Sequence, residues 1–175
     1  MRAHQDLVYS TAVRITANDA QAQDIAQEVF IKAYDNFDQL RNNPSAGGWL
    51  RVVARNLSLN YAMRQRKRWR LFSELSSAGE EDAEDFAAGI AVPDAALDGA
   101  SEQTRSELIE RALRALPERQ RVPLVLYHFE GMAYEEIAQY LRVSLAKVKV
   151  DIHRARAALV KILEQCGITA EDVTT

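Results

Sequence analysis

The chain has 175 residues, of which 47% are hydrophobic, and a net charge of −3 at neutral pH. This composition supports one ordinary folded domain or two small ones, and it excludes a chain that is disordered throughout. The sequence contains neither a run of roughly 18 apolar residues nor the apolar core of a signal peptide, so we expect no membrane insertion. Its single cysteine, Cys166, cannot form a disulfide framework, and together these features predict a cytoplasmic location.

Helical periodicity predicts two helices between the N-terminus and Phe37. The second begins at Asn18, a preferred capping residue that Gln21 follows three positions later. The polar side of this second helix carries Asp24, Gln27 and Glu28 next to apolar residues. Such a mixed surface fits a protein partner, although a helix face exposed to solvent would have the same composition. The apolar residues are Leu7, Val8, Ala12, Val13 and Ile15 in the first helix, with the rows Ile25, Val29, Ala33 and Ala26, Phe30, Tyr34 in the second.

A long helix is predicted after residues 42–48, where asparagine, proline and glycine interrupt the pattern. Along this helix, apolar side chains recur every four residues, which indicates that they share one side. We predict that they form a single buried ridge, made of Trp49, Val53, Leu57 and Tyr61.

The stretch 39–73 contains eight basic residues and no acidic residue, and aromatic residues are interleaved with the basic ones. This composition is typical of a surface that follows a phosphate backbone and stacks bases. Trp49 and Tyr61 also belong to the apolar ridge, so the core is an alternative place for them. Asn56 and Asn60 suit hydrogen bonds with base edges, and a polar helix face explains them equally well.

The charge is unevenly distributed along the chain. Residues 1–72 carry a net charge of +5, residues 73–110 carry −10 and residues 111–175 carry +2. The local charge matters for phosphate binding, because fields are screened within about 10 Å at ordinary salt. The acidic stretch has weak periodicity, which predicts a linker over 73–103, although it contains a few apolar residues that are able to dock.

Helical pattern resumes at Thr104, which forms a capping box with Glu107, and Pro117 fits the first turn of the next helix. A short helix, a turn at Val143-Ser144 and a longer helix capped by Ser144 then give the spacing of a helix-turn-helix. Its apolar positions are Ile137, Leu141, Val143, Val148 and Ile152, and Ala138 is the small residue where the helices cross.

Basic residues fall on the outer faces of the last helix if Val148 and Ile152 point inward. There they reach base edges and phosphates, which makes Lys149, Arg154 and Arg156 candidates for DNA contact. A helical bundle with a solvated basic face is the alternative interpretation. His153 fits either an exposed helix position or a contact.

Several short motifs follow one another in order across almost the whole chain. They are Asp24-Ile25-Ala26-Gln27-Glu28-Val29-Phe30, Trp49-Leu50, Ala54-Arg55-Asn56, Leu116-Pro117-Glu118-Arg119-Gln120-Arg121, Tyr134-Glu135-Glu136-Ile137-Ala138 and His153-Arg154-Ala155-Arg156. Together they resemble the extracytoplasmic-function (ECF) subfamily of bacterial RNA polymerase sigma factors. The resemblance implies an alternative sigma factor that directs promoter-specific transcription initiation and is not an enzyme.

The resemblance also implies partners for each module. The N-terminal domain would bind the clamp helices of the largest subunit of core RNA polymerase and melt the −10 element, and the C-terminal domain would read the −35 element. An anti-sigma factor would cover both polymerase-binding surfaces, and the linker would follow the RNA-exit path. The implied residues are Asp24, Gln27, Glu28 and Phe30 for polymerase; Arg41, Arg51, Arg55, Asn56 and Asn60, with the 41–48 loop, for −10 DNA; and Lys147, Lys149, His153, Arg154 and Arg156 for −35 DNA.

Some positions depart from the pattern of this family. Arg142 stands where a turn glycine is common, and Lys147 replaces a frequent threonine. Val150 and Asp151 stand where serine and arginine are often found, and Asp151 would repel phosphate if it faced DNA. The chain also begins inside what resembles the first helix of the family, so an N-terminal segment is expected to be missing or shifted.

We therefore predict an all-α protein with two small helical domains joined by an acidic linker, without a cofactor or a metal site. The domains are 1–72 for polymerase binding and −10 recognition and 104–167 for −35 recognition, with the linker at 73–103 and a tail at 168–175. A stand-alone helix-turn-helix regulator is the alternative function. A nuclease is disfavoured, because the three histidines lie far apart and no cluster has metal-ligand spacing.

Overall fold

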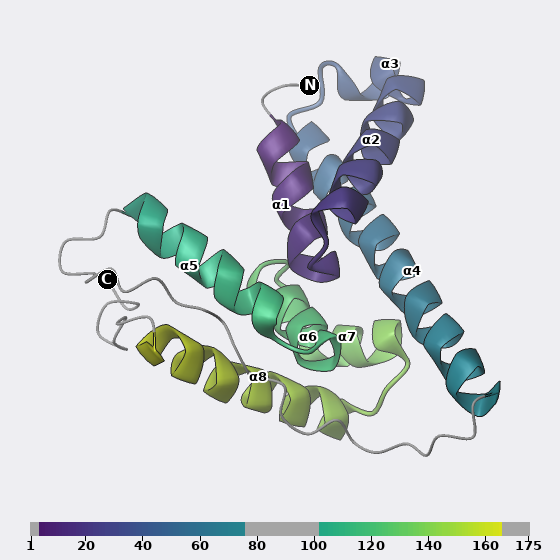
Figure 1. Ribbon diagram of the computed structural model, residues 1–175. Helices are drawn as coiled ribbons and strands as arrows, with labels where there is room; N and C mark the ends of the chain where they lie inside the picture. Colours follow the sequence, from purple (N-terminus) through teal and green to yellow (C-terminus); the bar gives the residue numbers. More distant parts are fainter. Residues whose placement is uncertain (1–3, 76–101, 166–175) are drawn as a thin grey trace. The chain divides into compact units, whose positions relative to one another are not determined.

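The computed structural model describes residues 4–75 and 102–165, which form eight helices and contain no strand (Figure 1). The chain divides into two compact units, one before and one after the interval 76–101. The predicted all-α class is therefore confirmed. Most of the predicted linker, the tail and Cys166 lie outside the described residues, while residues 73–75 and 102–103 belong to the adjoining helices.

The first unit contains α1 (Gln5–Thr16), α2 (Asp19–Asp35), α3 (Phe37–Leu40) and α4 (Ala46–Leu75). Its core lies where α1, α2 and α4 meet, and the predicted row Ile25, Val29 and Ala33 is buried there. The predicted start of α2 is confirmed, because Asn18 Oδ1 accepts a hydrogen bond from the backbone N–H of Gln21 at 3.0 Å.

The predicted ridge of α4 is one position away from the residues that are most deeply buried. Trp49 and its three companions in that ridge are half-buried at the margin of the core. The buried row is instead Leu50, Ala54, Ser58 and Ala62. Three of these four side chains are small, which lets α4 approach α1, and the Ser58 hydroxyl donates to the Ala54 carbonyl at 2.7 Å. A search for large apolar residues misses such a row, because close helix packing favours small ones.

The second unit contains α5 (Glu102–Ala115), α6 (Glu118–His128), α7 (Tyr134–Leu141) and α8 (Leu145–Gln165), and α8 packs against the other three. Since α5 begins at Glu102, the predicted capping box at Thr104 is wrong: Thr104 lies inside the helix. Pro117 directly precedes α6 as its capping residue rather than standing in its first turn. The predicted starts differ from the observed ones by three residues for α5 and by one residue for α6.

Candidate nucleic-acid interface

The predicted helix-turn-helix is formed by α7 and α8, and Ile137, Val148 and Ile152 are fully buried between these helices and α6. Between the two helices, Arg142 adopts φ 55° and ψ 46°. This left-handed conformation is the reason that a glycine suits the position. The predicted cap of α8 is confirmed, because Ser144 Oγ accepts a hydrogen bond from the backbone N–H of Lys147 at 3.2 Å.

The buried face of α8 orients its basic residues outward. Because Val148, Ile152 and Ala155 face the core, the positions between them other than the buried Asp151 point to the surface. The structure thereby brings the predicted −35 residues Lys147, Lys149, His153, Arg154 and Arg156 to the exposed sides of one helix.

Arg156 is engaged within the protein by two residues of α6. Its guanidinium lies 3.1 Å from His128 Nε2 and stacks over the Tyr127 ring at 5.4 Å. Tyr127 also contacts the Tyr134 ring, with 4.7 Å between the ring centroids. A guanidinium has no acceptor, so His128 Nε2 accepts and the histidine is neutral in this arrangement. Partial burial and the charge of Arg156 both lower the pKa of His128, in agreement with that state.

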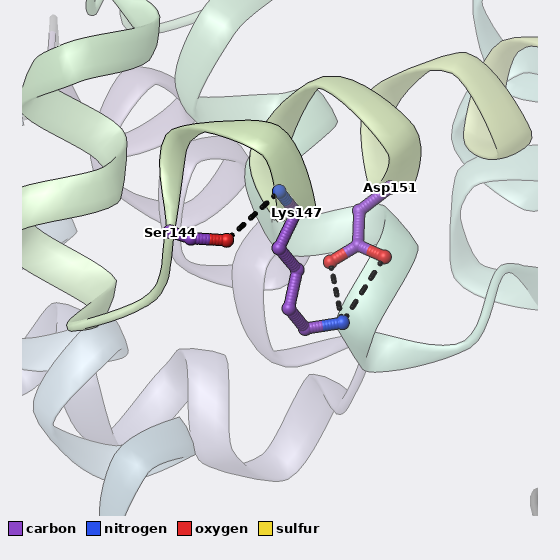
Figure 2. Close-up of polar contacts among 3 residues, drawn as sticks. All are labelled: Ser144, Lys147 and Asp151. Atoms are coloured by element: carbon purple, nitrogen blue, oxygen red, sulfur yellow. Dashed lines mark hydrogen bonds and ion pairs between the residues drawn. The ribbon is translucent and has the colours of Figure 1, made fainter.

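Asp151, which was expected to repel phosphate if it faced DNA, does not project into solvent. The residue is only 5% exposed. Figure 2 shows its two carboxylate oxygens facing the ammonium group of Lys147, at 3.1 and 3.3 Å from Nζ. This pair was not predicted from the sequence, although the spacing of four residues on one helix was an available signal.

In the N-terminal unit, the predicted −10 residues lie on a loop and on two sides of α4. Arg41 is exposed where α3 ends, and the following loop turns at Asn43, whose side chain accepts a hydrogen bond from the Ser45 N–H at 2.8 Å. Successive residues of a helix are rotated by about 100°. Along α4, therefore, the pair Arg51 and Arg55 occupies one side and the pair Asn56 and Asn60 another.

An open groove with a volume of about 870 Å³ runs between α1 and α2. Of the predicted polymerase-binding residues, Gln27 and Phe30 line this groove. Asp24 and Glu28 are exposed outside it, and Glu28 pairs with Lys32 at 3.5 Å. The remaining lining residues are Gln5, Asp6 and Tyr9 of α1, none of which was predicted from the sequence to belong to a site, and Gln23, Ala26, Ile31 and Tyr34 of α2.

The second apolar row predicted for α2, which consists of Ala26, Phe30 and Tyr34, is only partly buried. Ala26 and Phe30 are half-buried, but Tyr34 is 73% exposed and the neighbouring Ile31 is 62% exposed. The last member of this row therefore lies outside the core and is part of the groove surface. Ile31 and Tyr34 thus add exposed apolar surface to this groove.

Within 4–75 and 102–165, no group of histidine, cysteine, aspartate and glutamate side chains is arranged to hold a metal ion. The helices described for these residues also include none with the length and apolar character that a membrane crossing requires.

Comparisons with known proteins agree with this arrangement. The family described as Sigma-70 region 2 matches residues 1–68, and the family described as Sigma-70, region 4 matches residues 106–159. The ECF RNA polymerase sigma factor SigW of Bacillus subtilis is 31% identical over 160 residues, which cover 91% of this chain and 84% of SigW. The RNA polymerase sigma-H factor of Pseudomonas aeruginosa is 32% identical over 164 residues, covering 92% of this chain and 82% of that protein.

A solved structure also resembles the chain. It is the co-crystal structure of the sigma factor RpoE in complex with the anti-sigma factor NepR from Bartonella quintana, with a TM-score of 0.50 and 21% identity over 93% of both chains. At this identity the likeness concerns the fold.

Proposed function

The chain belongs to the ECF subfamily of RNA polymerase sigma factors, and from this membership we propose which of its surfaces perform each step of initiation. As an alternative sigma factor, it binds core RNA polymerase and directs promoter-specific transcription. Sigma factors are regulatory DNA-binding initiation factors, so we propose no catalytic role. A stand-alone helix-turn-helix regulator is not favoured, because the matched regions include the N-terminal unit as well.

For −35 recognition, we propose that α8 enters the major groove of the duplex. The observation that carries this proposal is the set of exposed basic residues on α8, opposite a fully buried apolar face. A helix fits the major groove, where basic side chains donate to guanine O6 and N7 or to phosphates. Lys147, Lys149, His153 and Arg154 are the contacts, and Arg156 contributes mainly by fixing α8 against His128 and Tyr127.

The substitution Arg154→Ala tests this assignment. Binding of the holoenzyme to a −35 duplex should weaken, and the dependence of log K on log salt should become shallower by about 1 if Arg154 contacts a phosphate. Lys161→Ala is the matched control, because Lys161 is an exposed basic residue three turns further along α8 than Lys149. Equal binding of Arg154→Ala and wild type at every salt concentration would remove Arg154 from the site.

For the N-terminal unit, we propose that the groove between α1 and α2 receives the clamp helices of the largest polymerase subunit. Its half-buried Phe30 and exposed Ile31 supply apolar area, and Gln27 supplies a polar rim. The 41–48 loop and the asparagine side of α4 would hold the −10 strand, and Arg51 and Arg55 would contact its backbone. Asp24 and Glu28 would then lie at the edge of the polymerase interface.

We further propose that an anti-sigma factor controls this protein by covering the same groove. This proposal is supported by the similar sigma factor RpoE, which was crystallised in complex with the anti-sigma factor NepR. The proposed domains are 1–72 and 104–167, joined by the acidic stretch 73–103. Since core RNA polymerase is the working partner, the site of action would be the cytoplasm.

A further inference from the structure

The ion pair between Lys147 and Asp151 lies at the start of the proposed recognition helix and departs from two local preferences. Lys147 is the third residue of α8, a position where a capping box favours glutamate or glutamine and where the helix dipole disfavours a cation. Asp151 is a carboxylate at 5% exposure, which is unfavourable without a partner. Each residue compensates for the unfavourable placement of the other.

The geometry fixes both ends of Lys147. Its backbone N–H donates to Ser144 Oγ at 3.2 Å, and its Nζ lies 3.1 and 3.3 Å from the two oxygens of Asp151 (Figure 2). A free lysine side chain is a point charge on a flexible four-carbon stem. Here the charged end is held next to a buried carboxylate, while the lysine side chain keeps 43% of its surface exposed.

We propose that Asp151 is a positioning residue, which orients Lys147 so that its ammonium reads a base edge in the −35 duplex instead of following the phosphates. This inference rests on the proposed entry of α8 into the major groove. An ammonium has three N–H donors, so an acceptor such as guanine O6 or N7 binds beside the two carboxylate oxygens. Because the negative charge of Asp151 lies beside the ammonium, attraction to phosphate is weakened, and the fixed geometry favours a hydrogen bond at one base pair.

The pair also explains why an acidic residue is tolerated in this helix. Asp151 follows Lys147 by four residues, and it lies on the side of α8 where the exposed surface meets the core. Its charge is therefore directed at Lys147 rather than at the groove. The expected repulsion between Asp151 and DNA becomes a restraint on a DNA-contacting side chain.

The test uses the full chain bound to core polymerase and a −35 duplex that ends before the −10 element. The duplex is selected from a randomised pool by the wild-type complex. Affinity is measured for this duplex and for each single base-pair change, at several salt concentrations, with Asp151→Asn, Lys147→Met and the double variant. Lys161→Met is the matched control, and thermal unfolding of each variant reports its folding.

We expect Asp151→Asn and Lys147→Met each to reduce discrimination at the same base pair by about fivefold or more. Asp151→Asn should have no further effect on discrimination in the Lys147→Met background. In Asp151→Asn alone, the released lysine should turn to phosphate, which makes the salt slope steeper by about 0.9. A merely structural role for Asp151 would weaken binding to all duplexes alike and would not steepen the slope.

Two outcomes would overturn the proposal: a uniform loss of affinity in Asp151→Asn, or equal effects of Asp151→Asn with and without Lys147. If Asp151→Asn does not fold, Lys147→Arg decides, because it retains the charge but displaces the donors; unchanged discrimination in Lys147→Arg overturns the proposal. If Arg154→Ala still weakens binding in these cases, only the role of Asp151 fails. If no α8 variant changes binding, the proposed −35 interface fails as well.

Discussion

Arg121 offers a direct test of how the second unit holds its helix-turn-helix. The residue lies on α6 and is only 6% exposed, and its Nη1 donates to the Leu116 carbonyl at 2.8 Å. This carbonyl follows the end of α5, where backbone acceptors lack partners within the helix. Burial lowers the pKa of the Arg121 guanidinium and Glu118 raises it; the side chain stays charged because the pKa of arginine is so high.

The substitution Arg121→Met should destabilise the second unit by about 2 kcal/mol. A hydrogen bond from a charged donor contributes about 1.5–3 kcal/mol, and at this depth water cannot replace it at the Leu116 carbonyl. Methionine retains most of the apolar part of the arginine side chain and avoids burying a charge, so the loss of stability should stay below about 3 kcal/mol, the upper end of the range for such a bond. For a unit of this size, about 2 kcal/mol corresponds to a decrease of roughly 8–16 °C in Tm.

Differential scanning calorimetry of the full chain measures this effect, because the two units have separate cores. We expect the transition of the second unit to move and that of the first unit to stay. Arg111→Met is the matched control, since Arg111 is an exposed arginine of α5. If Arg121→Met melted like Arg111→Met, the bond to Leu116 would contribute little, and the reasoning from burial and distance would be wrong.

Further predictions concern the turn, the histidine and the groove. Arg142 has a φ of 55°, so Arg142→Gly should stabilise the second unit by about 0.5 kcal/mol and Arg142→Val should destabilise it. Unfolding by urea measures the free energy of unfolding of both variants, and the reverse order of stability would contradict this prediction. The depressed pKa of His128 means that its contribution to stability is complete above about pH 6.5, the unfolded value, and is lost as the pH falls through the lower folded value. His128→Gln should therefore reduce the loss of stability between pH 7 and 5, and an unchanged pH profile would count against the neutral histidine. Ile31→Asp should weaken core-polymerase binding at least tenfold, and it should not lower Tm because the side chain is 62% exposed. The control is Val52→Asp on α4, another exposed apolar position. Equal polymerase affinity of the two variants would exclude the groove as the polymerase-binding surface.

The helices were predictable wherever periodicity and capping coincide. The cap at Asn18, the row Ile25, Val29 and Ala33, and the turn before Ser144 are all present, because each depends on neighbours in sequence. The deepest row of α4 was not predictable in the same way. Ala54 and Ser58 are buried because α1 approaches closely, and this approach is a tertiary property that a hydrophobicity pattern does not contain.

The same distinction between local pattern and tertiary packing applies to the candidate sites. Periodicity correctly placed the basic residues of α8 on its exposed sides, because their places follow from the buried residues Val148 and Ile152. It did not reveal that Arg156 contacts His128, 28 residues earlier, since that contact depends on how α6 and α8 pack. The groove beside Phe30 likewise requires the side chains of α1, which no sequence motif connects to α2.

Run-off transcription measures directly whether this protein directs promoter-specific initiation. Purified core RNA polymerase, with and without this protein, is supplied with a library of promoter fragments that vary in the −35 and −10 regions. We expect specific transcripts that depend on the protein and start downstream of one preferred pair of elements. The absence of any specific transcript, together with specific binding of the free protein to duplex DNA, would contradict this expectation and would favour a stand-alone regulator.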